Sequence, residues 1–178
     1  NDFVINGNQF IENYLIYKNV IPNASALLIR KSTIEALGGF EIPNELRYCG
    51  DWLLYFKLAL HHKVGFVADS LNNFRYHSES VISKASNVES RISIINIDFL
   101  MREQMMQFLK KNKTNNHFLI ENINQEIINN LKYEKFLLYY RGNQKVKSLK
   151  LALTIPRTFF LNFNFEKRLK MKLKKWLS

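Results

Sequence analysis

The stretch that decides the fold is LRYCGDWLLYFKLAL, residues 46–60. Every residue from Trp52 to Leu60 except Lys57 is apolar, so the pattern predicts a helix that is buried on most of its faces. Asp51 stands where the preceding loop enters this helix, and its carboxylate is therefore fixed in space. Two interpretations stay open: a catalytic carboxylate, or a helix cap that accepts hydrogen bonds from free backbone N–H groups at the positive end of the helix dipole.

The residues before this helix form a series of short patterns. Ala24–Ile29 is a small-to-apolar run that predicts a buried strand, and it ends in the basic pair Arg30-Lys31. Ser32-Thr33 predicts the N-cap of a short helix. Gly38-Gly39 predicts its end, because a glycine takes the left-handed conformation that closes a helix.

The patterns on either side complete the first half of the chain. Val64–Val67 and Asn72–Tyr76 predict two further short strands, and His77 follows the second of them. Near the N-terminus, Asn8–Lys18 has apolar side chains spaced to cover one broad face of a helix. We therefore expect a mixed α/β layer with few, short strands.

The order of these patterns over residues 19–83 resembles the C-terminal half of the catalytic domain of family 2 glycosyltransferases, which have the GT-A fold. In that family a strand ending in a basic residue leads to a short helix and a Gly-Gly-Phe turn. An acidic pair then opens a helix, and an Arg-x-His strand end follows. Here Gly50-Asp51 stands in place of the acidic pair, so only Asp51 matches, and Arg75-Tyr76-His77 matches the strand end.

The resemblance implies roles for three residues in an inverting transfer of sugar from a nucleotide-sugar donor to a glycan or lipid-linked acceptor. Asp51 would be the general base that takes the proton of the acceptor hydroxyl. His77 would lie near the nucleotide diphosphate as a ligand of its magnesium or manganese ion, and Arg75 would be a cation beside phosphate. Without the resemblance, a histidine at a strand end is an ordinary surface residue. The implied process is polysaccharide or glycan biosynthesis.

The metal-binding Asp-x-Asp motif of that family belongs to its nucleotide-binding half, and no Asp-x-Asp occurs in these 178 residues. We therefore expect residues 1–85 to be the acceptor-side, partially GT-A-like half of a larger enzyme, inactive alone. The alternative is a non-catalytic helical interaction or membrane-docking module. Gly50 in place of an acid also keeps open a degenerate, inactive transferase.

The second half of the chain is basic and predicts an all-α region. Residues 1–89 hold 8 Lys and Arg against 9 Asp and Glu, whereas residues 90–178 hold 18 against 6. This asymmetry predicts a boundary near residues 83–89, with a basic helical C-terminal extension over 86–178. Apolar spacing predicts helices over Val88–Lys111, His117–Arg141 and Lys145–Thr154, and a fourth after Pro156. The whole chain is therefore expected to be helix-dominated.

The last predicted helix, residues 165–177, has apolar residues along one stripe and lysines on its other faces: Phe165, Leu169, Leu173 and Trp176. This pattern is typical of an interfacial membrane helix, and equally of a solvated helix docked on its own domain. We find no groove-reading motif, so no nucleic-acid partner is expected. The single cysteine, Cys49, is interpreted as buried packing and fits a reducing compartment. No apolar run reaches membrane-spanning length, so we expect a cytoplasmic protein with peripheral contact at the inner face of the cell membrane.

Overall fold

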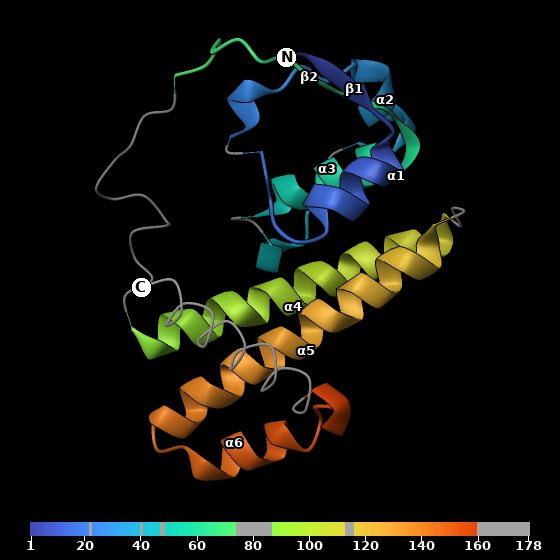
Figure 1. Cartoon of the computed structure of the whole chain (residues 1–178). Coiled ribbons are helices and arrows are strands. Elements are labelled where there is room, and N and C mark those ends of the chain that lie inside the picture. The colour runs from blue at the N-terminus through green and yellow to red at the C-terminus, as the bar shows by residue number, and fades with distance from the viewer. Residues whose placement is uncertain (22, 40, 47–48, 74–86, 113–115, 160–178) are drawn as a thin grey trace, which may run out of the picture. The chain divides into compact units, whose positions relative to one another are not determined.

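The computed structural model describes residues 1–21, 23–39, 41–46, 49–73, 87–112 and 116–159. Its contacts divide the chain into two compact units, residues 1–125 and 126–178, which are described separately below. The described residues are mostly helical, and their strands form a single two-stranded antiparallel sheet (Figure 1). A helix-dominated chain with few, short strands is therefore confirmed. The predicted boundary after residue 85 falls at residues 74–86, outside the described residues.

The sheet of the first unit joins its N-terminus to the residues that follow the central helix. Strand β1, Phe3–Ile5, pairs antiparallel with β2, Val64–Phe66. The rings of Phe3 and Phe66 face each other in the register and stack with 5.0 Å between their centroids. The predicted strand at 64–67 is thus confirmed, and its partner β1 was not predicted.

The central helix is α3, Gly50–His61, and it is buried as the sequence predicts. The predicted N-terminal helix is found as α1, Gly7–Phe10, continued by a π-helical turn at Ile11–Leu15. Helix α4, Val88–Lys111, packs on α3 together with a 3₁₀ turn at Asn44–Leu46. These elements share one apolar core, whose fully buried side chains include Ile11, Leu15, Ile16, Leu46, Phe56, Met101, Met105 and Leu109.

The strand predicted at Ala24–Ile29 is wrong. Ala24–Ala26 forms a 3₁₀ turn, and Leu27 continues in extended conformation with φ −115° and ψ 140°. Leu28 is fully exposed, and the run pairs with no strand of the described residues. A strand forms where a neighbouring strand pairs its backbone N–H and C=O groups, and neither strand of the described residues does so for this run. In the third predicted strand, Asn72 and Asn73 are not in a strand, and residues 74–76 lie outside the described residues.

Helix α2, Lys31–Ala36, begins earlier than predicted. Its N-cap is Arg30, and the Thr33 hydroxyl donates to the Arg30 carbonyl oxygen at 2.6 Å, so the predicted Ser32-Thr33 cap is wrong. The predicted stop is confirmed, because Gly38 and Gly39 have φ of +81° and +97°.

Gly7 lets α1 pack directly against the backbone of α3. A Cβ atom at this position would overlap the carbonyl oxygens of Ala59 and His62, which the helix end cannot easily move. We expect Gly7→Ala to lower the free energy of unfolding by about 1–3 kcal/mol, the range of overpacked cores, in urea denaturation. Gly65→Ala is the matched control, because a Cβ there meets no atom within 4 Å. A Gly7 variant as stable as this control would contradict the packing.

Two long helices follow the boundaries predicted from the sequence. Both α4 and α5, His117–Arg141, begin and end at the predicted residues, whereas α6, Lys145–Ala152, ends two residues before Thr154. Helix α5 crosses the division between the units. No described helix combines the length and the apolar character that crossing a membrane requires.

Aromatic side chains hold the second unit together. The ring of Tyr133 lies 5.9 Å from that of Phe136 and 6.0 Å from that of Phe159. The ammonium groups of Lys135 and Lys147 lie 5.8 Å and 5.7 Å from the centroid of the Tyr139 ring. Burial lowers the pKa of Lys135. The predicted fourth helix and the segment 165–177 fall mostly or wholly at residues 160–178, outside the described residues.

Candidate functional site

Asp51 lies in the first turn of α3, with its carboxylate half-buried and held from two sides. Its Oδ2 accepts a long hydrogen bond of 3.4 Å from Asn19 Nδ2, and its Oδ1 accepts one of 2.8 Å from the backbone N–H of Trp52. Asn19 is itself fixed, because its Oδ1 accepts from the backbone N–H of Ile21 at 3.1 Å. The Trp52 N–H also donates to the Cys49 carbonyl oxygen at 3.1 Å, so Asp51 shares this donor of the helix start, and Cys49 occupies the N-cap position. The helix-capping and catalytic interpretations are compatible.

Gly50, which stands where the family 2 pattern has its first acid, is a buried packing position. A Cβ atom on Gly50 would overlap the side chain of Ile42. Any larger residue there would push Ile42 out of its place. Close packing against Ile42 therefore favours glycine at this position.

A cluster of buried polar side chains packs against this end of α3. The Trp52 indole N–H donates to the Leu15 carbonyl oxygen at 2.8 Å, and the Arg102 guanidinium lies 5.6 Å from the Trp52 ring centroid. Arg102 is 1% exposed and donates to the Ile16 carbonyl oxygen at 2.9 Å. Its Nε lies 3.0 Å from Asp98 Oδ1. This cluster fixes the orientation of Trp52, and so of the helix turn that presents Asp51.

The two charges of this cluster have shifted pKa values. Burial raises the pKa of the Asp98 carboxyl above its usual range, and the nearby Arg102 guanidinium opposes the rise. Burial likewise lowers the pKa of Arg102, and Asp98 opposes that change. The Arg102 side chain is 1% exposed and that of Asp98 is 23% exposed, and each charge is stabilised by the other.

Cys49 is unsuited to nucleophilic chemistry in this environment. Burial raises the pKa of its thiol to about 11, and the negative charges of Asp51 and Asp98 add to the rise. The thiol is therefore neutral at physiological pH, and the thiolate is the reactive form. Cys49 is half-buried, and not fully buried as the sequence predicts.

The reactivity of Cys49 gives a test of the charges around it. We expect its alkylation by iodoacetamide, followed by mass spectrometry, to keep rising with pH up to at least pH 9.5, because the pKa is about 11. Asp51→Asn or Asp98→Asn removes a negative charge, lowers the pKa and should speed alkylation at pH 9. A wild-type rate that levels off near pH 8 would contradict this environment.

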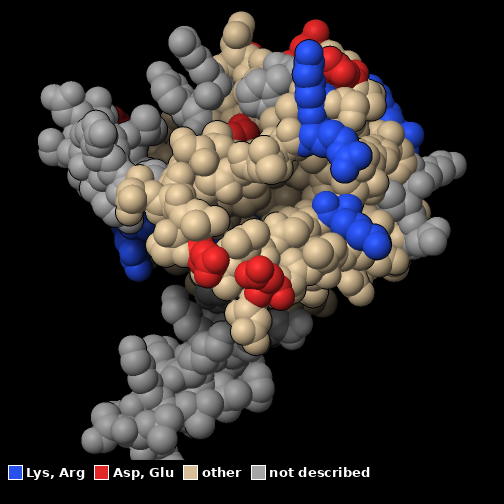
Figure 2. All heavy atoms as spheres, turned by 90° about the horizontal axis from the view of Figure 1, so that it is seen from above, with Lys and Arg blue, Asp and Glu red and all other residues tan. Residues whose placement is uncertain are grey.

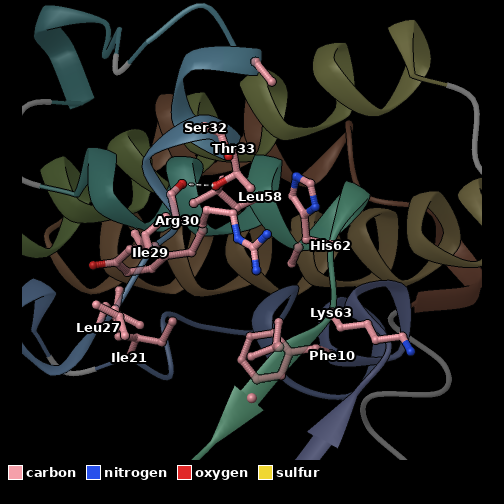
Figure 3. Close-up of a pocket in the computed structure, with 16 residues that line it drawn as sticks. Phe10, Ile21, Leu27, Ile29, Arg30, Ser32, Thr33, Leu58, His62 and Lys63 are labelled. Carbon is pink, nitrogen blue, oxygen red and sulfur yellow. Dashed lines mark hydrogen bonds between the residues drawn. The ribbon is translucent and has the colours of Figure 1, made fainter.

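A pocket of about 560 Å³ lies beside α3 in the first unit. Tyr55, one helical turn after Asp51, is among its lining residues. Ile21, two residues after Asn19, lines it as well (Figure 3). Asp51 itself is not among the lining residues. The pocket was not predicted from the sequence, because its walls come from segments that are far apart along the chain.

Two of the three predicted site residues cannot be placed. Arg75 and His77 lie outside the described residues, so their approach to Asp51, their contact with a nucleotide and the metal role of His77 stay predictions. Among residues the structure does describe, no group of three or more His, Cys, Asp and Glu side chains could hold a metal ion.

Comparison with known proteins identifies no relative. No family model matches the chain, and it has no match among curated proteins or among solved structures. The resemblance to family 2 glycosyltransferases stays a prediction from the residues quoted above.

Proposed function

We propose that this chain is the acceptor-side half of an inverting glycosyltransferase with a GT-A-like fold, in which Asp51 is the general base. The observation that carries the proposal is a lone carboxylate in the first turn of a buried helix. Asn19 and the Trp52 N–H hold its two oxygens, and a pocket opens one turn away. Such a carboxylate is pre-oriented and needs little reorganisation to accept a proton.

In the proposed reaction the acceptor hydroxyl oxygen attacks the anomeric carbon of the sugar. The bond from that carbon to the diphosphate oxygen breaks, and the diphosphate leaves with the electron pair. The hydroxyl proton passes to Asp51, which later returns it to solvent. A magnesium or manganese ion would be held by the nucleotide-binding half with His77 as a proposed ligand, and Arg75 would be a cation beside the diphosphate.

The experiment that tests this function uses the longer polypeptide we propose. Its upstream sequence should contain a strand-rich nucleotide-binding half with an Asp-x-Asp motif. That polypeptide should transfer label from a nucleotide sugar to a saccharide or lipid-linked acceptor, while residues 1–178 alone should not. A folded, full-length polypeptide that transfers none of a panel of nucleotide sugars would overturn the proposal.

The same preparation tests the competing function, a membrane-docking or interaction module. Binding to anionic vesicles that is lost when residues 165–177 are deleted, with no transferase activity in the full-length polypeptide, would favour docking as the function. Transfer activity that survives this deletion would assign the segment a role separate from catalysis. The proposed location, at the inner face of the cell membrane, depends on the same measurement.

A further inference from the structure

The pocket beside α3 has the size and the lining of a small-molecule site. Its volume of about 560 Å³ falls within the range of about 300–1,000 Å³ typical of ligand pockets. Its walls come from the segment between Ile21 and Ala36, from α3 and from the start of β2. Most of the lining is apolar and includes Phe10, Ile21, Leu27, Leu58 and Ala59.

The charged groups of the pocket have one sign. Arg30 and Lys63 are the charged residues among the sixteen that line it, His62 adds an imidazole, and none is acidic. Figure 3 shows the Arg30 guanidinium extending toward the His62 ring, with the Lys63 ammonium farther out. Figure 2 shows a hollow in the surface with Lys and Arg side chains along one side of it, and Asp and Glu side chains also lie on this face. The pocket therefore favours a ligand with a negative group and an apolar body.

One buried polar group in the pocket wall has no partner in the described part of the chain. Tyr55 is 5% exposed, and its hydroxyl makes no hydrogen bond there. Leaving a buried hydroxyl without a hydrogen bond is unfavourable. A ligand oxygen in the pocket would remove this cost by accepting from, or donating to, the phenol.

We propose that this pocket binds an amphiphilic anion, a phosphate ester of an apolar chain. Arg30 and His62 would hold the phosphate, and Lys63 would add charge near the opening. Arg30 and Lys63, both exposed, together carry two positive charges, which match the charge of about −1.5 to −2 on a phosphate monoester at neutral pH. The chain would lie on the apolar wall, and an ester oxygen would meet Tyr55. The transferase proposal cites the same pocket, but a binding test without donor or acceptor can succeed or fail without deciding whether the chain takes part in sugar transfer.

The test measures binding to the 178-residue chain by calorimetry, with octyl phosphate below its micelle concentration as the probe. The comparison probes are inorganic phosphate, octanol and octyltrimethylammonium. We expect octyl phosphate to bind at least about tenfold more tightly than each of them, because only it presents both the charge and the chain. Inorganic phosphate that binds equally well would reduce the site to a surface anion contact, and equal binding of octanol would reduce it to an apolar hollow. Either outcome, or no binding of octyl phosphate, overturns the proposal.

Variants separate the pocket from general basic charge. Arg30→Gln should weaken octyl phosphate binding about tenfold, the typical effect of losing one charge-assisted hydrogen bond. Tyr55→Phe keeps the ring and should weaken binding several-fold while the melting temperature stays the same or rises. Lys31→Gln is the matched control, because Lys31 is exposed, pairs with Glu35 and does not line the pocket. If Lys31→Gln weakens binding as much as Arg30→Gln, the effect is nonspecific charge and the proposal fails.

Discussion

Replacing Asp51 with asparagine in the full-length polypeptide is expected to lower sugar transfer about a hundred- to ten-thousand-fold, the usual cost of losing a general base. The amide has nearly the shape of the carboxylate, but it cannot take the proton of the acceptor hydroxyl. Binding of the nucleotide sugar should be nearly unchanged, because Asp51 acts on the acceptor. Transfer is measured with a labelled donor, and donor affinity is measured separately.

The same variant distinguishes catalysis from helix capping. Asparagine caps about as well as aspartate and still offers an oxygen to the Trp52 N–H, so the melting temperature should hardly change. Glu45→Gln is the matched control, because it removes an exposed carboxylate six residues earlier and should leave transfer intact. An Asp51→Asn enzyme with near wild-type transfer would reduce the residue to a cap. An Asn19→Ala variant should lower transfer less, because the Trp52 N–H still holds Asp51.

The second large effect is on stability. We expect Arg102→Met to lower the free energy of unfolding by about 3 kcal/mol, the low end of the range for breaking a buried ion pair, because it leaves the Asp98 carboxylate, whose side chain is 23% exposed, without its partner. The carbonyl oxygens of Ile16 and Tyr17 also lose the guanidinium that donates to them. Urea denaturation measures the loss, and Lys110→Gln on the exposed side of α4 is the control.

The stability that Arg102→Met loses should depend on pH, because it depends on whether the Asp98 carboxyl is ionised. Burial already raises the pKa of this carboxyl, and removing Arg102 removes the effect that opposes the rise. The folded variant therefore binds a proton more tightly than the unfolded chain does. Its stability relative to wild type should recover as the pH falls through the raised pKa, because a neutral carboxyl does not need the guanidinium.

A double variant gives the second check. Replacing both Asp98 with Leu and Arg102 with Met should cost less than Arg102→Met alone, because no unpaired charge stays buried. A single variant that loses less than about 1 kcal/mol, or a double variant worse than the single, would contradict the role of the pair.

The sequence by itself determined the helices. The backbone hydrogen bonds of α3, α4 and α5 join residues four apart. The residues that form each helix therefore lie in one continuous stretch of sequence, and that stretch has its own apolar spacing. The position of Asp51 at the start of α3 follows from the same local pattern. Gly38 and Gly39 likewise mark a local stop through their own positive φ.

Only the tertiary structure decided the strands and the surroundings of Asp51. The run from Ala24 to Ile29 has strand-forming residues, but a strand also needs a partner from elsewhere in the chain, and here β2 pairs with β1. Asn19 meets Asp51 across 32 positions, and Arg102 meets Ile16 across 86. The pocket is likewise assembled from separate segments by packing on α3. Such contacts depend on how separate elements pack together. The spacing of residues within one stretch cannot predict that packing.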